Sequence, residues 1–71
     1  MIHRDQTERN PDGSFGVRKL WLCNNQHDMD AINAWCEESL TDDWRHVERP
    51  MIDYFCFNSD EDATLFVLRW S

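Results

Sequence analysis

The alternation of apolar and polar positions predicts a strand over residues 17–23. Leu20 and Leu22 would point to one side of this strand and Trp21 and Cys23 to the other, because successive strand side chains alternate between faces. The polar stretch Asn-Asn-Gln-His that follows ends the run.

Two further runs predict a β-hairpin in the second half of the chain. Residues 44–48 alternate weakly, residues 51–58 carry apolar side chains on both sides, and Arg49-Pro50 between them favours a turn. Asp53 interrupts the side that also holds Phe55 and Phe57, so we expect one end of this strand to face water.

Two segments have the spacing and the start signals of helices. Residues 28–40 begin at Asp28, a residue type that caps helices, and their apolar stripe consists of Met29, Ile32, Trp35, Cys36 and Leu40. Ser59 followed by Asp62 is similar to a capping box and predicts a second helix, whose apolar face is Ala63, Phe66, Val67 and Trp70. A strand over residues 65–70 is the alternative, because Leu-Phe-Val-Leu has no polar interruption.

Residues 1–16 are polar and contain the turn signal Asn10-Pro11-Asp12-Gly13. We expect a flexible N-terminal arm over residues 1–16, followed by a single α+β domain over residues 17–71. The alternative is a hairpin in which residues 1–4 pair with residues 15–19.

The elements of this domain run β-α-β-β-α. Their simplest packing is a two-layer α+β sandwich, in which a small, mainly antiparallel sheet carries both helices on one face. The order is that of half a ferredoxin-like fold without its last strand, which leaves a sheet edge open to a partner. We expect the core to gather around Ile32, Trp35, Phe55, Phe57 and Phe66.

Composition indicates a folded protein with reduced cysteines. Hydrophobic residues make up 41% of the 71 residues and aromatic residues 13%, which is too rich for a disordered chain. Cys23, Cys36 and Cys56 are odd in number and lie in apolar segments, so we expect buried free thiols. The N-terminus has no apolar segment typical of a secretory signal, and no run is long enough to span a bilayer, so we expect a cytoplasmic location.

The formal net charge is −7, and residues 20–71 hold eleven acidic residues against three basic ones. This balance disfavours a binder of duplex DNA or membrane surfaces, which needs a basic face. The acids cluster at helix ends and loops, which predicts a negative stripe that engages a basic groove, unless they only keep the protein soluble. The candidate partner-binding residues are Glu37, Glu38, Asp42, Asp43, Trp44, Asp60, Glu61 and Asp62.

Motifs for catalysis and metal binding are weak. Cys23 and His27 with Cys36, His46 or His3 could supply zinc ligands, but the sequence lacks a tight C-x-x-C pair. The same residues could form a cysteine–histidine nucleophile, which needs a basic environment that the acidic surroundings do not offer. Adjacent carboxylates are typical of solvated caps, and the sequence has no glycine-rich phosphate loop. We therefore expect no enzyme, no cofactor and no metal site.

Aromatic residues suggest a second surface. Trp21 would lie on the sheet face opposite the helices, where it could form an interface with an aromatic residue of 51–57. Bases could stack there if Arg18, Lys19, Arg45 and Arg49 supply positive charge. Packing beneath the arm or within a dimer explains these aromatic residues equally well.

The segment Tyr54–Trp70 resembles a C-terminal pattern in small uncharacterised accessory proteins of tailed bacteriophages. In these proteins an aromatic strand leads through acidic residues to an Asp-Ala step, here Asp62-Ala63, and an aliphatic-aromatic run ends near Arg-Trp, here Arg69-Trp70. The resemblance covers about a quarter of the chain. It implies a viral accessory protein that binds host machinery, and it carries no site residues over.

Together these patterns predict a small acidic, phage-encoded protein that inhibits or otherwise occupies a host protein in the host cytoplasm, without direct contact to nucleic acid or membrane. One alternative is an acidic mimic of nucleic acid that blocks a basic groove. Another is a structural or self-assembling virion component. A nucleic-acid-binding sheet is the fourth reading.

Overall fold

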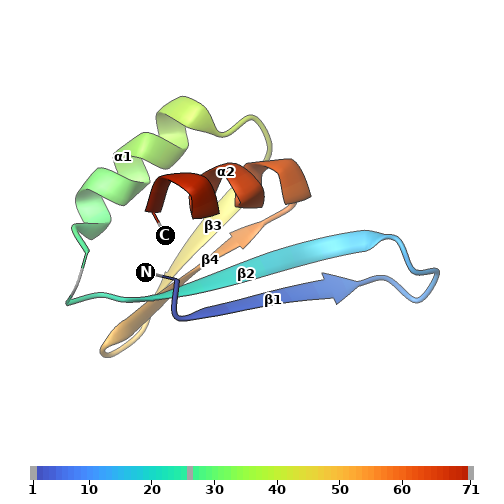
Figure 1. Cartoon of the computed structure of the whole chain (residues 1–71), viewed down its shortest axis with the longest axis horizontal. Coiled ribbons are helices and arrows are strands. Elements are labelled where there is room, and N and C mark those ends of the chain that lie inside the picture. Colours follow the sequence, from blue (N-terminus) through green and yellow to red (C-terminus); the bar gives the residue numbers. More distant parts are fainter. Residues whose placement is uncertain (1, 26, 71) are drawn as a thin grey trace.

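A computed structural model of the chain describes residues 2–25 and 27–70 (Figure 1). Both helices lie on the same face of a four-stranded sheet, which confirms the predicted two-layer α+β sandwich. In chain order the elements are β1 (Arg4–Arg9), β2 (Phe15–Cys23), α1 (Met29–Ser39), β3 (Trp44–Glu48), β4 (Ile52–Phe57) and α2 (Asp60–Trp70).

The sheet is antiparallel throughout and has the strand order β1-β2-β4-β3. Leu20 on β2 lies opposite Phe55 on β4, and Phe55 lies opposite His46 on β3, so these three side chains share the face that the helices cover. Trp21 lies opposite Tyr54 one position along, and this pair therefore points to the other face. The prediction that Trp21 faces away from the helices is confirmed.

Residues 4–9 form a strand, so the predicted N-terminal arm over residues 1–16 is wrong for them, and no domain boundary falls at residue 17. β1 pairs with β2 from Arg4 opposite Trp21 to Arg9 opposite Phe15. The alternative of a hairpin is right in kind but wrong in register, and its first residue lies outside the described residues. β1 could not be recognised from the sequence because it is an edge strand. Its side chains are mostly exposed, so the strand lacks the alternation of apolar and polar residues that marks a half-buried strand.

The predicted turn signal closes this hairpin. Gly13 has a φ of +88°, a conformation that glycine adopts without steric cost, and its N–H donates to the Asn10 carbonyl at 2.9 Å. Asp12 Oδ1 accepts the backbone N–H of Ser14 at 2.9 Å, an arrangement that replaces a backbone turn bond. The turn therefore reverses the chain after β1, so that β2 runs antiparallel beside it.

Both helices begin at the predicted capping residues. Asp28 Oδ1 accepts the N–H groups of Asp30 and Ala31 at 3.1 and 3.2 Å, and Ser59 Oγ accepts the N–H of Asp62 at 3.2 Å. α2 continues to Trp70, so the alternative strand over residues 65–70 is wrong.

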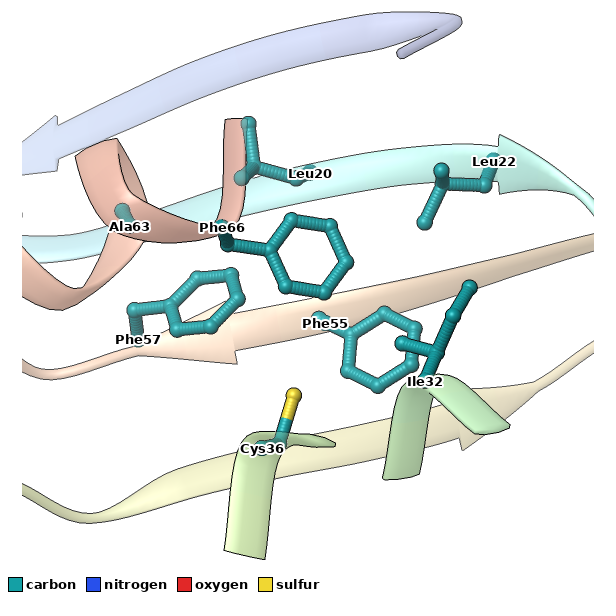
Figure 2. Packing of buried hydrophobic residues seen from close by; sticks show 8 residues of the cluster. All are labelled: Leu20, Leu22, Ile32, Cys36, Phe55, Phe57, Ala63 and Phe66. Atoms are coloured by element: carbon teal, nitrogen blue, oxygen red, sulfur yellow. The ribbon is translucent and has the colours of Figure 1, made fainter. Parts of the chain in front are cut away.

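Side chains from both layers meet in one core between the sheet and the helices (Figure 2). The ring of Phe66 on α2 lies 5.0 Å from that of Phe55 and 5.1 Å from that of Phe57 on β4, measured between centroids. Trp35 is only partly buried and packs edge-on against Phe66 at 6.1 Å. The fully buried hydrophobic residues among those described are Leu20, Leu22, Ile32, Cys36, Phe55, Phe57, Ala63 and Phe66. The predicted core is therefore confirmed except that Trp35 lies at its rim.

Candidate functional site

The end of α1, the loop after it and the start of α2 come together at one end of the helix layer, above the sheet (Figure 1). The carboxylate of Asp62, in the first turn of α2, holds them in place. Its Oδ2 accepts the backbone N–H of Asp42 at 2.9 Å, and its Oδ1 accepts the hydroxyl of Thr41 at 3.3 Å and the N–H of Thr41 at 3.5 Å. The loop is therefore fixed to α2 by three hydrogen bonds to a single carboxylate.

Six exposed carboxylates surround this junction, and we refer to them as the acidic end: Glu37, Glu38, Asp42, Asp43, Asp60 and Glu61. Asp60 accepts a hydrogen bond from Arg18 at 3.0 Å. None of the other five carboxylates forms an ion pair with a side chain in residues 2–25 and 27–70. These six carboxylates therefore lie on the end of α1, on the loop after it and on the first turn of α2, and five of them have no ion pair among the described residues.

Two residues of the predicted binding set do not belong to this surface. Asp62 is only 2% exposed, and its oxygen atoms are occupied by the loop. Trp44 is half-buried at the start of β3, and its ring lies 6.2 Å from that of Phe55. Asp62 is thus buried where the sequence suggested an exposed carboxylate, and Trp44 packs against the core with part of its surface exposed.

Asp53 is also buried, although the sequence predicted that its end of β4 faces water. Its side chain is 4% exposed; its Oδ2 lies 2.7 Å from Nε2 of His46, and its Oδ1 accepts from Nδ2 of Asn24 at 3.2 Å. The imidazole of His46 stacks on Phe55, with 4.3 Å between centroids and 6° between planes. This polar cluster ties β3, β4 and the end of β2 together, and sequence spacing did not reveal it because its members come from three segments.

The three cysteines, which are candidates for metal binding or catalysis in the sequence analysis, lie in both layers of the sandwich, one on a helix and two on the sheet. Cys36 is buried in the core on α1, and burial raises the pKa of its thiol to about 12. Cys23 and Cys56 are half-buried on β2 and β4, with their side chains on the face away from the helices. All three are free thiols, as predicted, but only Cys36 is buried, so the expectation of three buried thiols is wrong for Cys23 and Cys56.

No group of three or more His, Cys, Asp or Glu side chains in the described part of the chain is placed to hold a metal ion, and that part contains no pocket. Nor is any helix within it long and apolar enough to cross a membrane. Comparisons of the chain with protein-family models, curated proteins and solved structures find no match. Function is therefore inferred from the side chains themselves.

Proposed function

We propose that this protein is a small, non-enzymatic binding factor whose acidic end docks on a basic surface of a partner protein. The observation that carries this proposal is the group of five exposed carboxylates without an ion pair among the described residues: Glu37, Glu38, Asp42, Asp43 and Glu61. Their fields add, so the group attracts a cluster of lysine and arginine side chains far more strongly than one carboxylate does.

The fold supports docking because it presents these charges on fixed elements. Glu37 and Glu38 lie on α1, Glu61 lies in the first turn of α2, and the loop with Asp42 is bound to Asp62. A surface that is ordered before binding loses little conformational entropy when a partner docks. The acidic end is therefore suited to a preformed basic groove.

The resemblance of Tyr54–Trp70 to phage accessory proteins supports placing the protein among factors that occupy a host protein. The three free thiols support a reducing compartment, the host cytoplasm. In this setting a host protein that exposes a basic groove is the proposed target, and occupying that groove inhibits it.

Affinity capture with paired charge variants tests the proposal. The acidic-end variant E37Q/E38Q/E61Q and the control D12N/D30N/E48Q remove the same number of charges, but the control residues lie outside the acidic end. We expect immobilised wild type and control to retain the same stoichiometric partner from a bacterial lysate, and the acidic-end variant to lose it. Equal retention by both variants, or no stoichiometric partner at all, contradicts the proposal.

The captured partner also distinguishes two forms of inhibition. If the partner binds DNA or RNA and releases it when the protein is added, the acidic end acts as a mimic of nucleic acid. If the partner keeps its nucleic acid, the acidic end occupies a different basic surface. In both cases binding weakens as salt rises, because salt screens exposed charges.

A further inference from the structure

The sheet has a second face, opposite the helices, which neither α1 nor α2 covers (Figure 1). The strand registers arrange its side chains in rows that cross all four strands, from β1 through β2 and β4 to β3. The aromatic row consists of Arg4, Trp21, Tyr54 and Val47, and the basic row beside it of Gln6, Lys19, Cys56 and Arg45. We refer to these two rows as the open face.

The aromatic row places two rings side by side at the centre of the sheet. The centroids of Trp21 and Tyr54 are 5.4 Å apart, and the rings are inclined by 35°. The guanidinium of Arg4 lies 5.0 Å from the centroid of Trp21, and that of Arg49 lies 6.0 Å from the centroid of Tyr54. Both rings are half-buried. Each ring also has a guanidinium group within cation–π distance of its centroid.

The basic row places two cations on either side of Cys56. Lys19 on β2 and Arg45 on β3 both lie directly opposite Cys56 on β4, so the two cations flank the thiol. Burial raises the pKa of the Cys56 thiol, and the charges of Lys19 and Arg45 act to lower it. Lys19 also forms an ion pair with Glu8 at 3.2 Å. Arg45 has no ion pair among the described residues, and its side chain is exposed.

The two sides of the sandwich therefore differ in charge. Four of the seven basic residues lie on or over the open face, namely Arg4, Lys19, Arg45 and Arg49, whereas the acidic end lies on the helix layer. At physiological salt the Debye length is about 8 Å, so charges on the far layer are largely screened from a ligand at the sheet. A net charge of −7 for the whole chain does not prevent the open face from binding an anion.

We propose that the open face binds single-stranded nucleic acid, with bases stacked on Trp21 and Tyr54 and phosphates contacted by Lys19, Arg45 and Arg49. Flat aromatic rings beside cations suit unpaired bases, because a base in a duplex keeps its faces within the stack. An acidic protein would use the cations but would gain little from the pair of rings. The proposal departs from the sequence-based expectation of no direct nucleic-acid contact, which rested on total charge.

Fluorescence anisotropy with labelled oligonucleotides of about 12 nucleotides tests this, using oligo-dT, oligo-U and a duplex of equal length in about 100 mM salt, where the Debye length is about 10 Å. The variant K19Q/R45Q removes the two positive charges of the basic row. The control R9Q/R69Q removes the same charge from the hairpin end and from α2, outside both rows. The variant W21L removes the ring but keeps an apolar side chain.

We expect wild type and control to bind the single strands more tightly than the duplex. K19Q/R45Q should weaken binding about tenfold and make the slope of log K against log salt shallower by about 1.4, which is about 0.7 for each of the two lost phosphate contacts to a single strand. W21L should weaken binding at least fivefold, which corresponds to the loss of one stacked base.

Three results would overturn the proposal. One is the absence of binding by wild type at this salt concentration, and another is an equal loss of affinity in K19Q/R45Q and R9Q/R69Q. The third is a dimer in sedimentation equilibrium that W21L dissociates, since a second copy would then occupy the open face. If W21L fails to fold, the comparison of the two charge variants still decides the outcome.

Discussion

The side chain of Asp62 accepts the backbone N–H of Asp42, with 2.9 Å between Oδ2 and the nitrogen atom. The two residues are separated along the chain, and this bond joins the start of α2 to the loop that follows α1. Because the carboxylate is 2% exposed, water does not compete for it. Asp62 is therefore a positioning residue, which fixes the loop after α1 against the first turn of α2.

Replacing Asp62 should destabilise the protein far more than replacing its exposed neighbour. D62A leaves the N–H groups of the loop without an acceptor, so we expect the free energy of unfolding to fall by about 2–3 kcal/mol. D62N keeps one acceptor oxygen and should lie between wild type and D62A. E61A is the control, with an expected change within about 0.5 kcal/mol. Urea unfolding measures all three, and a stability of D62A equal to that of E61A would contradict this role.

Arg18 connects β2 to both β1 and α2. It donates two hydrogen bonds to Asp5, of 2.9 Å from Nε and 2.6 Å from Nη2, and a third from Nη1 to Asp60 at 3.0 Å. The hydrogen bond from Arg18 holds the pKa of Asp5 below its usual value of 3.8. A lowered pKa means that this pair stabilises the fold above about pH 4 and that the contribution is lost as pH falls through the folded-state pKa.

R18Q should therefore destabilise the protein at pH 7 by about 1 kcal/mol, a modest value because the Asp5 carboxylate is partly exposed. The difference between R18Q and wild type should shrink as pH falls through the folded-state pKa of Asp5, because a protonated carboxyl no longer pairs with Arg18. R9Q, which removes an exposed charge at the end of the same hairpin, serves as the control. A difference that stays constant between pH 7 and pH 2, measured by urea unfolding, would argue against the Arg18–Asp5 pair as its source.

Cys36 should resist thiol reagents in the native protein. Burial raises the pKa of its thiol to about 12, so almost none of the reactive thiolate is present at pH 8. We expect iodoacetamide to label half-buried Cys23 first and Cys36 only after urea is added, as peptide mass spectrometry would show. The same shift means that stability should fall as pH rises above about 9, where the unfolded thiol ionises. Native labelling of Cys36 as fast as Cys23 would contradict its burial.

Met51 is the one non-glycine residue with positive φ in the part of the chain that the structure describes. Its φ is +69° in the turn before β4, and its side chain is 80% exposed, so no packing compensates for the strained backbone. M51G should be more stable than M51A by about 1 kcal/mol, because glycine adopts this conformation without a steric clash. Thermal unfolding compares the two variants, and a more stable M51A would show that the turn is not strained.

The helices and the core could be predicted from the sequence because their signals are local. Asp28 and Ser59 cap the helices that follow them, and the apolar stripes of both helices lie where their spacing placed them. β1 could not be predicted in this way. Its backbone is paired on one side only, and its side chains are mostly exposed and polar, so β1 carries no alternating apolar pattern.

The surfaces that we propose for binding were predictable only in outline. The sequence identified the acidic residues of the acidic end, but it treated Asp62 as one of them, because burial depends on the loop that Asp62 meets in three dimensions. Asp53 was misplaced for the same reason, since its partners His46 and Asn24 lie in other segments. The pairing of Trp21 with Tyr54 likewise required the register of β2 and β4.

Amide NMR shifts test most directly whether the acidic end is the docking surface for a basic partner. An oligoarginine peptide, added to the ¹⁵N-labelled protein at low salt, imitates the charge of such a partner without requiring its identity. We predict that the largest shifts fall on Glu37, Glu38, Asp42, Asp43 and Glu61 and disappear in E37Q/E38Q/E61Q. Shifts of equal size at Asp12, Asp30 and Glu48 would show that the peptide follows total charge, and the acidic end would then have no special role.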